Sequence, residues 1–154
     1  MLLSQTAEYA LRAVIHIAQH AGDGPVRANA IAPALGVPAN YLAKTLHQLV
    51  RAGVLRSARG PQGGFRLARP AAALTIAQIV ACFTDTGERR CLLADRPCGE
   101  DPGCPVHARW RPVAAHMYGF LGTTTIADLL GDAAAPCPPA PPTARPSTLH
   151  APQP

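Results

Sequence analysis

The chain has 154 residues, of which 48% are hydrophobic and only 5% aromatic, and its formal net charge is +5. This length accommodates one domain and an appendage. No apolar run reaches the length of a membrane span, and the first residues lack the pattern of a secretory signal peptide. We therefore expect a cytoplasmic protein with no membrane partner, in a compartment where cysteines stay reduced and can bind metal.

The charge is unevenly distributed along the chain. Residues 1–70 contain eight Lys and Arg residues against two acidic residues, a net charge of +6. Residues 71–107 contain three Arg and five acidic residues, a net charge of −2. A basic first half joined to an acidic segment indicates an anionic partner for the first half alone.

The first half has the pattern of three helices. Apolar residues at helical spacing predict a helix over residues 4–20, and a turn rich in Gly ends it. A second helix is expected at 28–35, where Pro33 would be tolerated only near the first turn. A third is expected at 38–52, closed by Gly53 in a left-handed conformation. Its buried stripe consists of Leu42, Leu46, Leu49 and Val50.

The second and third of these helices are typical of a helix-turn-helix, because a Gly-containing turn joins them and the third has a polar, basic outer face. Residues 54–57 and 65–67 then alternate as two short strands, which predicts a hairpin, or wing. At its tip Arg59 could enter a minor groove, and the backbone at Gly60 could approach phosphates. Together, in the basic half, these features favour DNA binding.

The second half is expected to contribute further helices. Thr75 is placed to cap a fourth helix, and Cys82 shares its apolar face as a small buried hydrophobe. Residues 108–121 form a long helical stretch, which Pro112 would kink unless the helix begins later. Such a helix is a natural dimerisation element. A short capped segment at 126–130 follows it.

Three cysteines and one histidine gather in a segment rich in Gly, Pro and Asp. Cys91, Cys98, Cys104 and His107 have the spacing C-x6-C-x5-C-x2-H. Thiolates select iron–sulfur clusters, zinc or copper(I). These gaps exceed those of paired cysteines in zinc sites and better suit a larger group such as a cluster. A disulfide is less expected, because the chain has five cysteines, an odd number; unrelated surface cysteines are the other alternative.

These patterns predict a mainly α fold with a small β-hairpin wing, divided into four parts. A winged helix-turn-helix DNA-binding domain occupies residues 1–83, and a cysteine-rich cluster-binding loop, here called the cysteine segment, occupies 84–107. A dimerisation helix region follows at 108–131. Residues 132–154 form a Pro-rich tail whose composition predicts disorder.

Several motifs together carry a family resemblance. They lie at residues 3–10, 39–44, 51–55 and 59–64, and in the three cysteines ahead of His107. With these motifs the chain, to about residue 131, resembles the winged-helix regulators that include IscR, NsrR and RirA. The resemblance implies a homodimer that reads a palindromic operator in double-stranded DNA. It also implies an iron–sulfur cluster, 2Fe-2S or 4Fe-4S, in each subunit close to the helix-turn-helix.

The resemblance further implies roles for single residues. Asn40, Tyr41 and Lys44 would face bases or phosphates from the recognition helix, and Arg59 would serve the wing. The chemistry agrees, because amides suit adenine edges and cationic side chains suit guanine or phosphate.

The fourth ligand of the cluster has two candidates among the residues, and the third possibility is that no protein residue fills the position. His107 matches the His ligand of IscR-like members, which favours the two-iron form. Glu8 matches a carboxylate that NsrR-like members supply from the partner subunit, which is compatible with the four-iron form.

The predicted function is a DNA-binding transcriptional regulator, expected to be a repressor, whose operator affinity a cluster switches in response to nitric oxide, redox state or iron supply. The alternatives are a zinc-stabilised or cluster-free winged-helix regulator and, less expected, a small electron-transfer protein, which normally supplies four cysteines per cluster. No nucleophile–base–acid constellation is present, so an enzyme is not expected.

Overall fold

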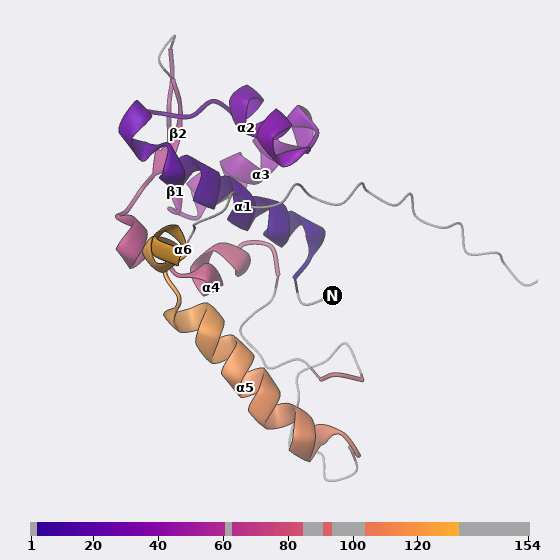
Figure 1. Ribbon diagram of the computed structural model, residues 1–154. Coiled ribbons are helices and arrows are strands. Elements are labelled where there is room, and N and C mark those ends of the chain that lie inside the picture. The colour runs from indigo at the N-terminus through magenta and orange to yellow at the C-terminus, as the bar shows by residue number, and fades with distance from the viewer. Residues whose placement is uncertain (1–2, 61–62, 85–90, 94–103, 133–154) are drawn as a thin grey trace, which may run out of the picture.

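A computed structural model of the chain describes residues 3–60, 63–84, 91–93 and 104–132 (Figure 1). Cys98 and residues 133–154 of the predicted tail lie outside them. The described elements are, in order, α1 (Gln5–Gln19), the 3-10 helix η1 (Ala21–Asp23), α2 (Ala28–Leu35), α3 (Ala39–Arg51), β1 (Leu55–Ala58), β2 (Gly64–Leu67), the 3-10 helix η2 (Ala71–Ala73), α4 (Ile76–Val80), α5 (His107–Thr123) and α6 (Ile126–Asp132). The predicted fold class, mainly helical with a two-stranded hairpin, is confirmed.

Helix α1 runs through the centre of the core and contacts α2, α3, α4, α6 and β2 (Figure 1). Its fully buried positions follow helical spacing and include several alanines, whose small side chains let neighbouring helices approach closely. They pack against the buried stripe of α3, in which Leu42, Leu46 and Leu49 are each 0% exposed. The predicted stripe is therefore confirmed for these three leucines, whereas Val50 is only half-buried.

The turns at both ends of α3 are set by glycines in the left-handed region. Gly53 has φ 72°, as predicted, and the amides of Gly53 and Val54 donate to the carbonyls of Val50 and Leu49, each at 3.0 Å. This pair of bonds satisfies the last carbonyls of the helix. Gly36 closes α2 in the same way, with φ 64°. Backbone hydrogen bonds therefore end both α2 and α3 at a glycine.

The wing is an antiparallel hairpin in which Leu55 pairs with Leu67 and Ala58 with Gly64. It is held to the domain by Val26, which exchanges two backbone hydrogen bonds of 2.9 and 2.8 Å with Phe65. The tip requires a glycine at position 63, because a Cβ there would lie 2.4 Å from the carbonyl oxygen of Ala58.

Two capped helices close the other end of the domain. Thr75 caps α4 in a reciprocal arrangement with Gln78, as predicted for Thr75. Thr125 and Asp128 cap α6 in the same way, at 2.8 and 3.1 Å. The amide of Ile126 donates to the carbonyl of Leu74 at 2.8 Å, so α6 is joined to the start of α4.

Helix α5 differs from the sequence-based expectation. It begins at His107 and continues through Pro112, although the proline was expected to kink the helix or to precede it. Pro112 leaves the carbonyl of Ala108 without its helical donor, but both residues are exposed, so water can satisfy that carbonyl. Pro33 was expected to be tolerated only near the first turn of its helix, but it lies beyond the first turn of α2 (Ala28–Leu35), where it is likewise exposed. Among the described residues no helix is both long and apolar enough to cross a membrane.

Candidate nucleic-acid interface and metal-binding segment

The outer face of α3 is polar and basic. Its exposed side chains recur at positions i, i+4, i+7 and i+11 and so lie along one face of the helix: Asn40, Lys44, His47 and Arg51. The opposite face is buried against α1 and α2. Since an α-helix fits the major groove of B-DNA, this exposed face can present an amide, an imidazole and two cations to base edges and phosphates.

Tyr41 has a second role beside the predicted DNA contact. The residue is 38% exposed, but its hydroxyl is hydrogen-bonded to the hydroxyl of Thr6 in the first turn of α1. Its ring also meets the edge of Tyr9, with centroids 6.0 Å apart and planes at 84°. These contacts brace the start of α3 against α1, so Tyr41 orients the recognition helix.

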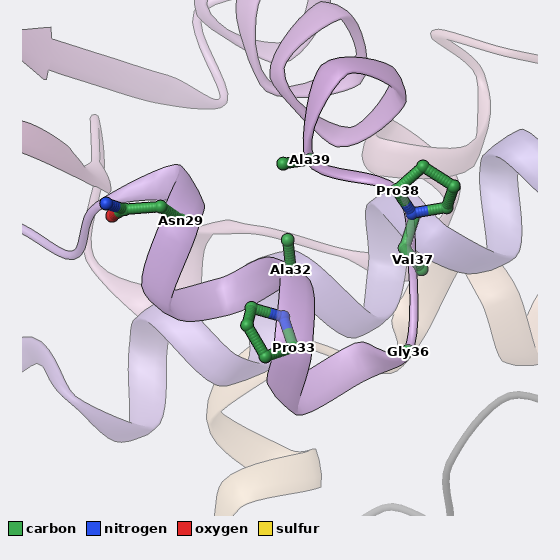
Figure 2. Close-up of a pocket in the computed structure, with 7 residues that line it drawn as sticks. All are labelled: Asn29, Ala32, Pro33, Gly36, Val37, Pro38 and Ala39. Atoms are coloured by element: carbon green, nitrogen blue, oxygen red, sulfur yellow. The ribbon is translucent and has the colours of Figure 1, made fainter.

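The turn between α2 and α3 is hollowed on its outer side, as Figure 2 shows. The lining contains no nucleophile and no titratable group, so the hollow does not have the chemistry of an active site. Its lining residues are Asn29, Ala32, Pro33, Gly36, Val37, Pro38 and Ala39.

The wing carries cations on its exposed face. Arg59 and Gly60 are exposed at its tip, as their predicted roles require, and Gly60 has φ 103°. Arg56 and Arg66 stand directly opposite each other in the strand register, and both are exposed. Like charges at opposed positions destabilise a hairpin, and a polyanion beside them relieves the repulsion. This pair therefore indicates an anionic partner along the wing.

An aromatic contact joins the wing to α3. The ring of His47 meets the ring of Phe65 edge-on, with centroids 5.6 Å apart and planes at 72°. The recognition helix and the wing therefore form one surface. The sequence analysis did not select His47, Arg51, Arg56 or Arg66 as DNA contacts. Helical spacing from Lys44 could have indicated the first two, and the strand register the two arginines of the wing.

The described part of the cysteine segment contains three of the predicted ligands. Cys91 and Cys104 are half-buried, and His107 is the first residue of α5. The amide of His107 donates to the carbonyl of Cys104 at 3.2 Å, so these two residues share one turn. Within residues 3–60, 63–84, 91–93 and 104–132, no group of three or more His, Cys, Asp or Glu side chains is arranged to hold a metal ion.

Glu8, the alternative ligand, lies in the first turn of α1. Its carboxylate is paired with Arg12 one turn later, with an N···O distance of 2.8 Å. The structure of the single chain therefore does not bring Glu8 into a ligand group with Cys91, Cys104 or His107.

Residues 82–84, which lead from α4 into the cysteine segment, are tied to both α1 and α3. The side chain of Gln48 donates to the carbonyl of Cys82 at 2.6 Å. The hydroxyl of Ser4, which caps α1, lies 3.1 Å from that of Thr84. Cys82 itself packs partly against the core, and burial raises the pKa of its thiol, which keeps it protonated. It was expected to be a small buried hydrophobe; it does pack against the core, but it is only half-buried.

Comparison with known proteins identifies the family. Residues 3–132 match the model of the Rrf2 family, described as an iron-dependent transcriptional regulator. A candidate HTH-type transcriptional regulator of Aquifex aeolicus is 37% identical over 133 residues, which cover 84% of this chain and 92% of the relative. The HTH-type transcriptional regulator IscR of Photobacterium profundum is 29% identical over 132 residues, which cover 86% of this chain and 77% of the relative.

Solved structures agree with this assignment. The structure of T. potens IscR superposes with a TM-score of 0.68 at 28% identity, covering 85% of this chain and 87% of that one. CymR, the global cysteine regulator of B. subtilis, shares the fold with a TM-score of 0.70 at 24% identity, covering 84% and 96%. The chain is therefore a DNA-binding transcriptional regulator rather than an enzyme, and it belongs to the Rrf2 family.

Proposed function

We propose that this protein is a cytoplasmic, homodimeric regulator whose affinity for a palindromic operator depends on an iron–sulfur cluster held by the cysteine segment. The observation that carries the proposal is the donor set itself, with three thiols and an imidazole within 17 residues of a chain whose family is described as iron-dependent. Cys91 and Cys104 are half-buried and have no place in the apolar core, unlike Cys82. Cysteine thiolates outside an apolar core fit a soft metal group.

Cys91, Cys98 and Cys104 would hold the cluster, with His107 as the fourth ligand. The turn shared by Cys104 and His107 supports His107, because both donors come from one hydrogen-bonded turn of backbone. Glu8 of a partner subunit is the alternative, and it would first have to leave Arg12. When bound, the cluster supplies a group whose integrity depends on iron supply, oxygen and nitric oxide.

A second copy of the chain would pair through α5. Only Ala114 and Leu121 of this helix are buried in the single chain, while Val113 and Phe120 are 55% and 52% exposed. These two residues are seven positions apart and so lie on one face of the helix. Figure 1 shows α5 extending away from the winged-helix domain. An apolar face on a projecting helix supports dimerisation through α5.

On the operator, Asn40 and Lys44 would contact bases in the major groove, and Tyr41 would orient α3 and contact a phosphate. The wing would place Arg59 in the minor groove, with the backbone at Gly60 beside it. The spacing of the two recognition helices across the dimer sets which half-sites fit. The contacts of Gln48 and Ser4 with residues 82–84 support a coupling between the order of the cysteine segment and the position of α3.

The deciding experiment is an anaerobic visible spectrum with iron, sulfide and zinc analysis of purified protein. We expect visible absorption, with iron present, that nitric oxide bleaches and that Cys98→Ala and Cys104→Ala abolish without loss of the dimer. Cys82→Ala is the matched control and should keep the chromophore. A colourless protein with stoichiometric zinc, even when prepared without oxygen and with iron supplied, would reject the cluster and favour a zinc-stabilised regulator.

The same spectra identify the fourth ligand. We expect His107→Ala to shift the absorption bands, or to lose them, while Glu8→Ala leaves them unchanged. The reverse result would assign the ligand to Glu8 of the partner subunit.

A further inference from the structure

His47 stands at the junction between α3 and the wing. The residue is exposed on the polar face of α3, and its ring meets the ring of Phe65 edge-on, with centroids 5.6 Å apart. Phe65 is only 8% exposed, and its backbone exchanges two hydrogen bonds with Val26. The imidazole of an exposed residue therefore rests against a side chain that the core holds in place.

The position of His47 between two DNA-binding elements indicates what it contacts. This inference rests on the proposed function, in which α3 lies in the major groove and the wing in the minor groove beside it. Because a sugar–phosphate strand separates adjacent grooves, one strand of the operator would pass between α3 and the wing. A side chain at the junction of these two elements faces that strand, and contacts with phosphates fix the register of a protein on the duplex.

The part of the chain around His47 carries cations and no carboxylate. Residues 24–84 contain seven Lys and Arg residues and no Asp or Glu, and His47 is their one histidine. On the polar side of α3, the opposite side being covered by α1 and α2, the charged groups of α3 and the wing are Lys44, Arg51, Arg56, Arg59 and Arg66. All of them are cations, so no anion of these elements favours a charged imidazole. A phosphate of DNA would be the first anion to do so.

The chemistry of histidine gives this contact a consequence. Histidine is the side chain that ordinarily exchanges its proton between pH 5 and pH 8. A neutral imidazole donates one hydrogen bond, whereas an imidazolium ring donates from both nitrogens and carries a charge. A charge-assisted hydrogen bond to a phosphate is about twice as strong as a neutral one. A phosphate beside the ring would therefore favour its protonated form.

We propose that His47 binds the DNA backbone between the two grooves and gains a proton in the complex, so that operator affinity rises as the pH falls. Because the complex holds more protons than free protein and free DNA, acid shifts the equilibrium toward the complex. The upper limit is one proton per subunit, which corresponds to an about tenfold gain in affinity per pH unit for each histidine. Phe65 acts as a positioning residue that holds the ring.

The test is fluorescence anisotropy of the full-length protein with an operator duplex selected from random sequences, between about pH 8 and pH 6. We expect the wild type to gain affinity as the pH falls. His47→Gln keeps a neutral donor but cannot gain a proton, so it should lose most of this gain and bind about tenfold more weakly at about pH 6. Lys44→Gln is the matched control on the same helix face. It removes a fixed charge, so its affinity should fall by the same factor at both pH values.

His47→Phe separates the proton from the packing. Phenylalanine can keep the edge-on contact with Phe65 but has no ring nitrogen. We expect the wild-type melting temperature, together with the weak pH dependence of His47→Gln. If His47→Phe matched the wild type at both pH values, the ring would serve packing alone and the proposal would be rejected. A wild-type pH dependence in His47→Gln would also reject it, while DNA binding by α3 and the wing would stand.

Uncharged phosphates locate the contact. Single methylphosphonates placed along the strand between the two grooves should, at one position in each half-site, weaken the wild type about tenfold and His47→Gln much less. Parallel losses in both proteins at every phosphate would overturn the backbone contact. Failure of the proposed function would look different, because selection would then yield no sequence that the wild type prefers over unrelated DNA.

Discussion

Gln48 of the recognition helix donates a hydrogen bond to the main-chain carbonyl of Cys82, with an N···O distance of 2.6 Å. The two residues are 34 positions apart, and Cys82 stands just before the cysteine segment. Gln48 is half-buried, so this bond is partly protected from water. It is a direct link between α3, the proposed recognition helix, and the residues that lead into the proposed ligands.

Replacing Gln48 by Ala should break that link. We expect a loss of about 1 kcal/mol in the free energy of unfolding, because the carbonyl of Cys82 loses its partner. The difference in operator affinity between iron-loaded and iron-free protein should also narrow. Urea denaturation and fluorescence anisotropy measure the two effects. Gln19→Ala, an exposed position at the end of α1, is the control; wild-type stability in Gln48→Ala would refute the first expectation.

Gly63→Ala should damage the wing. The new Cβ would lie 2.4 Å from the Ala58 carbonyl oxygen and 2.8 Å from that of Gly60, both of which are backbone atoms that cannot move aside. We expect destabilisation of more than about 1 kcal/mol and weaker operator binding. Gly22→Ala is the matched control, since its added Cβ meets no atom within 4 Å. Equal operator affinities for the two variants would show that the wing makes no contribution.

Arg66→Glu should change stability and DNA binding in opposite directions. Opposite Arg56 in the strand register, a glutamate replaces a repulsion by an attraction. The hairpin should gain a few tenths of a kcal/mol, of the order seen for cross-strand charge pairs. Operator affinity should fall, and Arg66→Ala should give an intermediate result in both assays. If affinity and stability fell together, the variant would be acting through misfolding instead of charge.

Arg59→Ala tests the tip of the wing. Arg59 is exposed. If its guanidinium neutralises a phosphate, the substitution should lower the slope of the logarithm of operator affinity against the logarithm of salt concentration by about one unit. Arg69→Ala, which removes a side chain bonded to Gln78 at 3.3 Å, is the control. An unchanged slope would remove Arg59 from the phosphate contacts.

The stability of the metal-free protein should depend on His16 at mildly acidic pH. Burial and His20 lower the pKa of His16 in the folded chain from its usual 6.5, so the unfolded chain binds the proton more readily. The folded state therefore keeps its full stability above that value and loses some of it as the pH falls below. His16→Gln should show a shallower loss between about pH 7 and pH 5. A wild-type slope in His16→Gln would show that His16 does not cause this loss of stability.

Local rules predicted much of this fold. The left-handed Gly53 and the Thr75 cap followed from the chemistry of helix ends, and the alternation around residues 54–67 predicted the wing. The course of α5 through Pro112 could not be predicted, because the cost of a proline depends on whether the orphaned carbonyl is buried. Partners distant in sequence, such as Gln48 and Cys82 or Arg56 and Arg66, depend on tertiary packing and strand register.

The candidate site was predictable to a smaller extent. Residue types and spacing selected Cys91, Cys104 and His107, and family resemblance added Glu8 as an alternative. Spacing alone does not predict whether three or more of these donors converge, and Cys98 lies outside the described residues. Asn40, Lys44 and Arg59 are exposed as a DNA contact requires, whereas the hydroxyl bond of Tyr41 to Thr6 depends on how α1 packs against α3.

Because α6 packs in the core of the DNA-binding domain, the C-terminal end of α5 is held to that domain. Ile126, three residues after α5, is 0% exposed within the core of the DNA-binding domain, and its amide is bonded to Leu74. The core is therefore assembled from two separate stretches of chain. A fragment that stopped before Thr124 would lack α6, which packs in that core. A displacement of α5 at the proposed contact with a second subunit would consequently reach the packing around α1 through α6, which contacts α1, without passing through the cysteine segment.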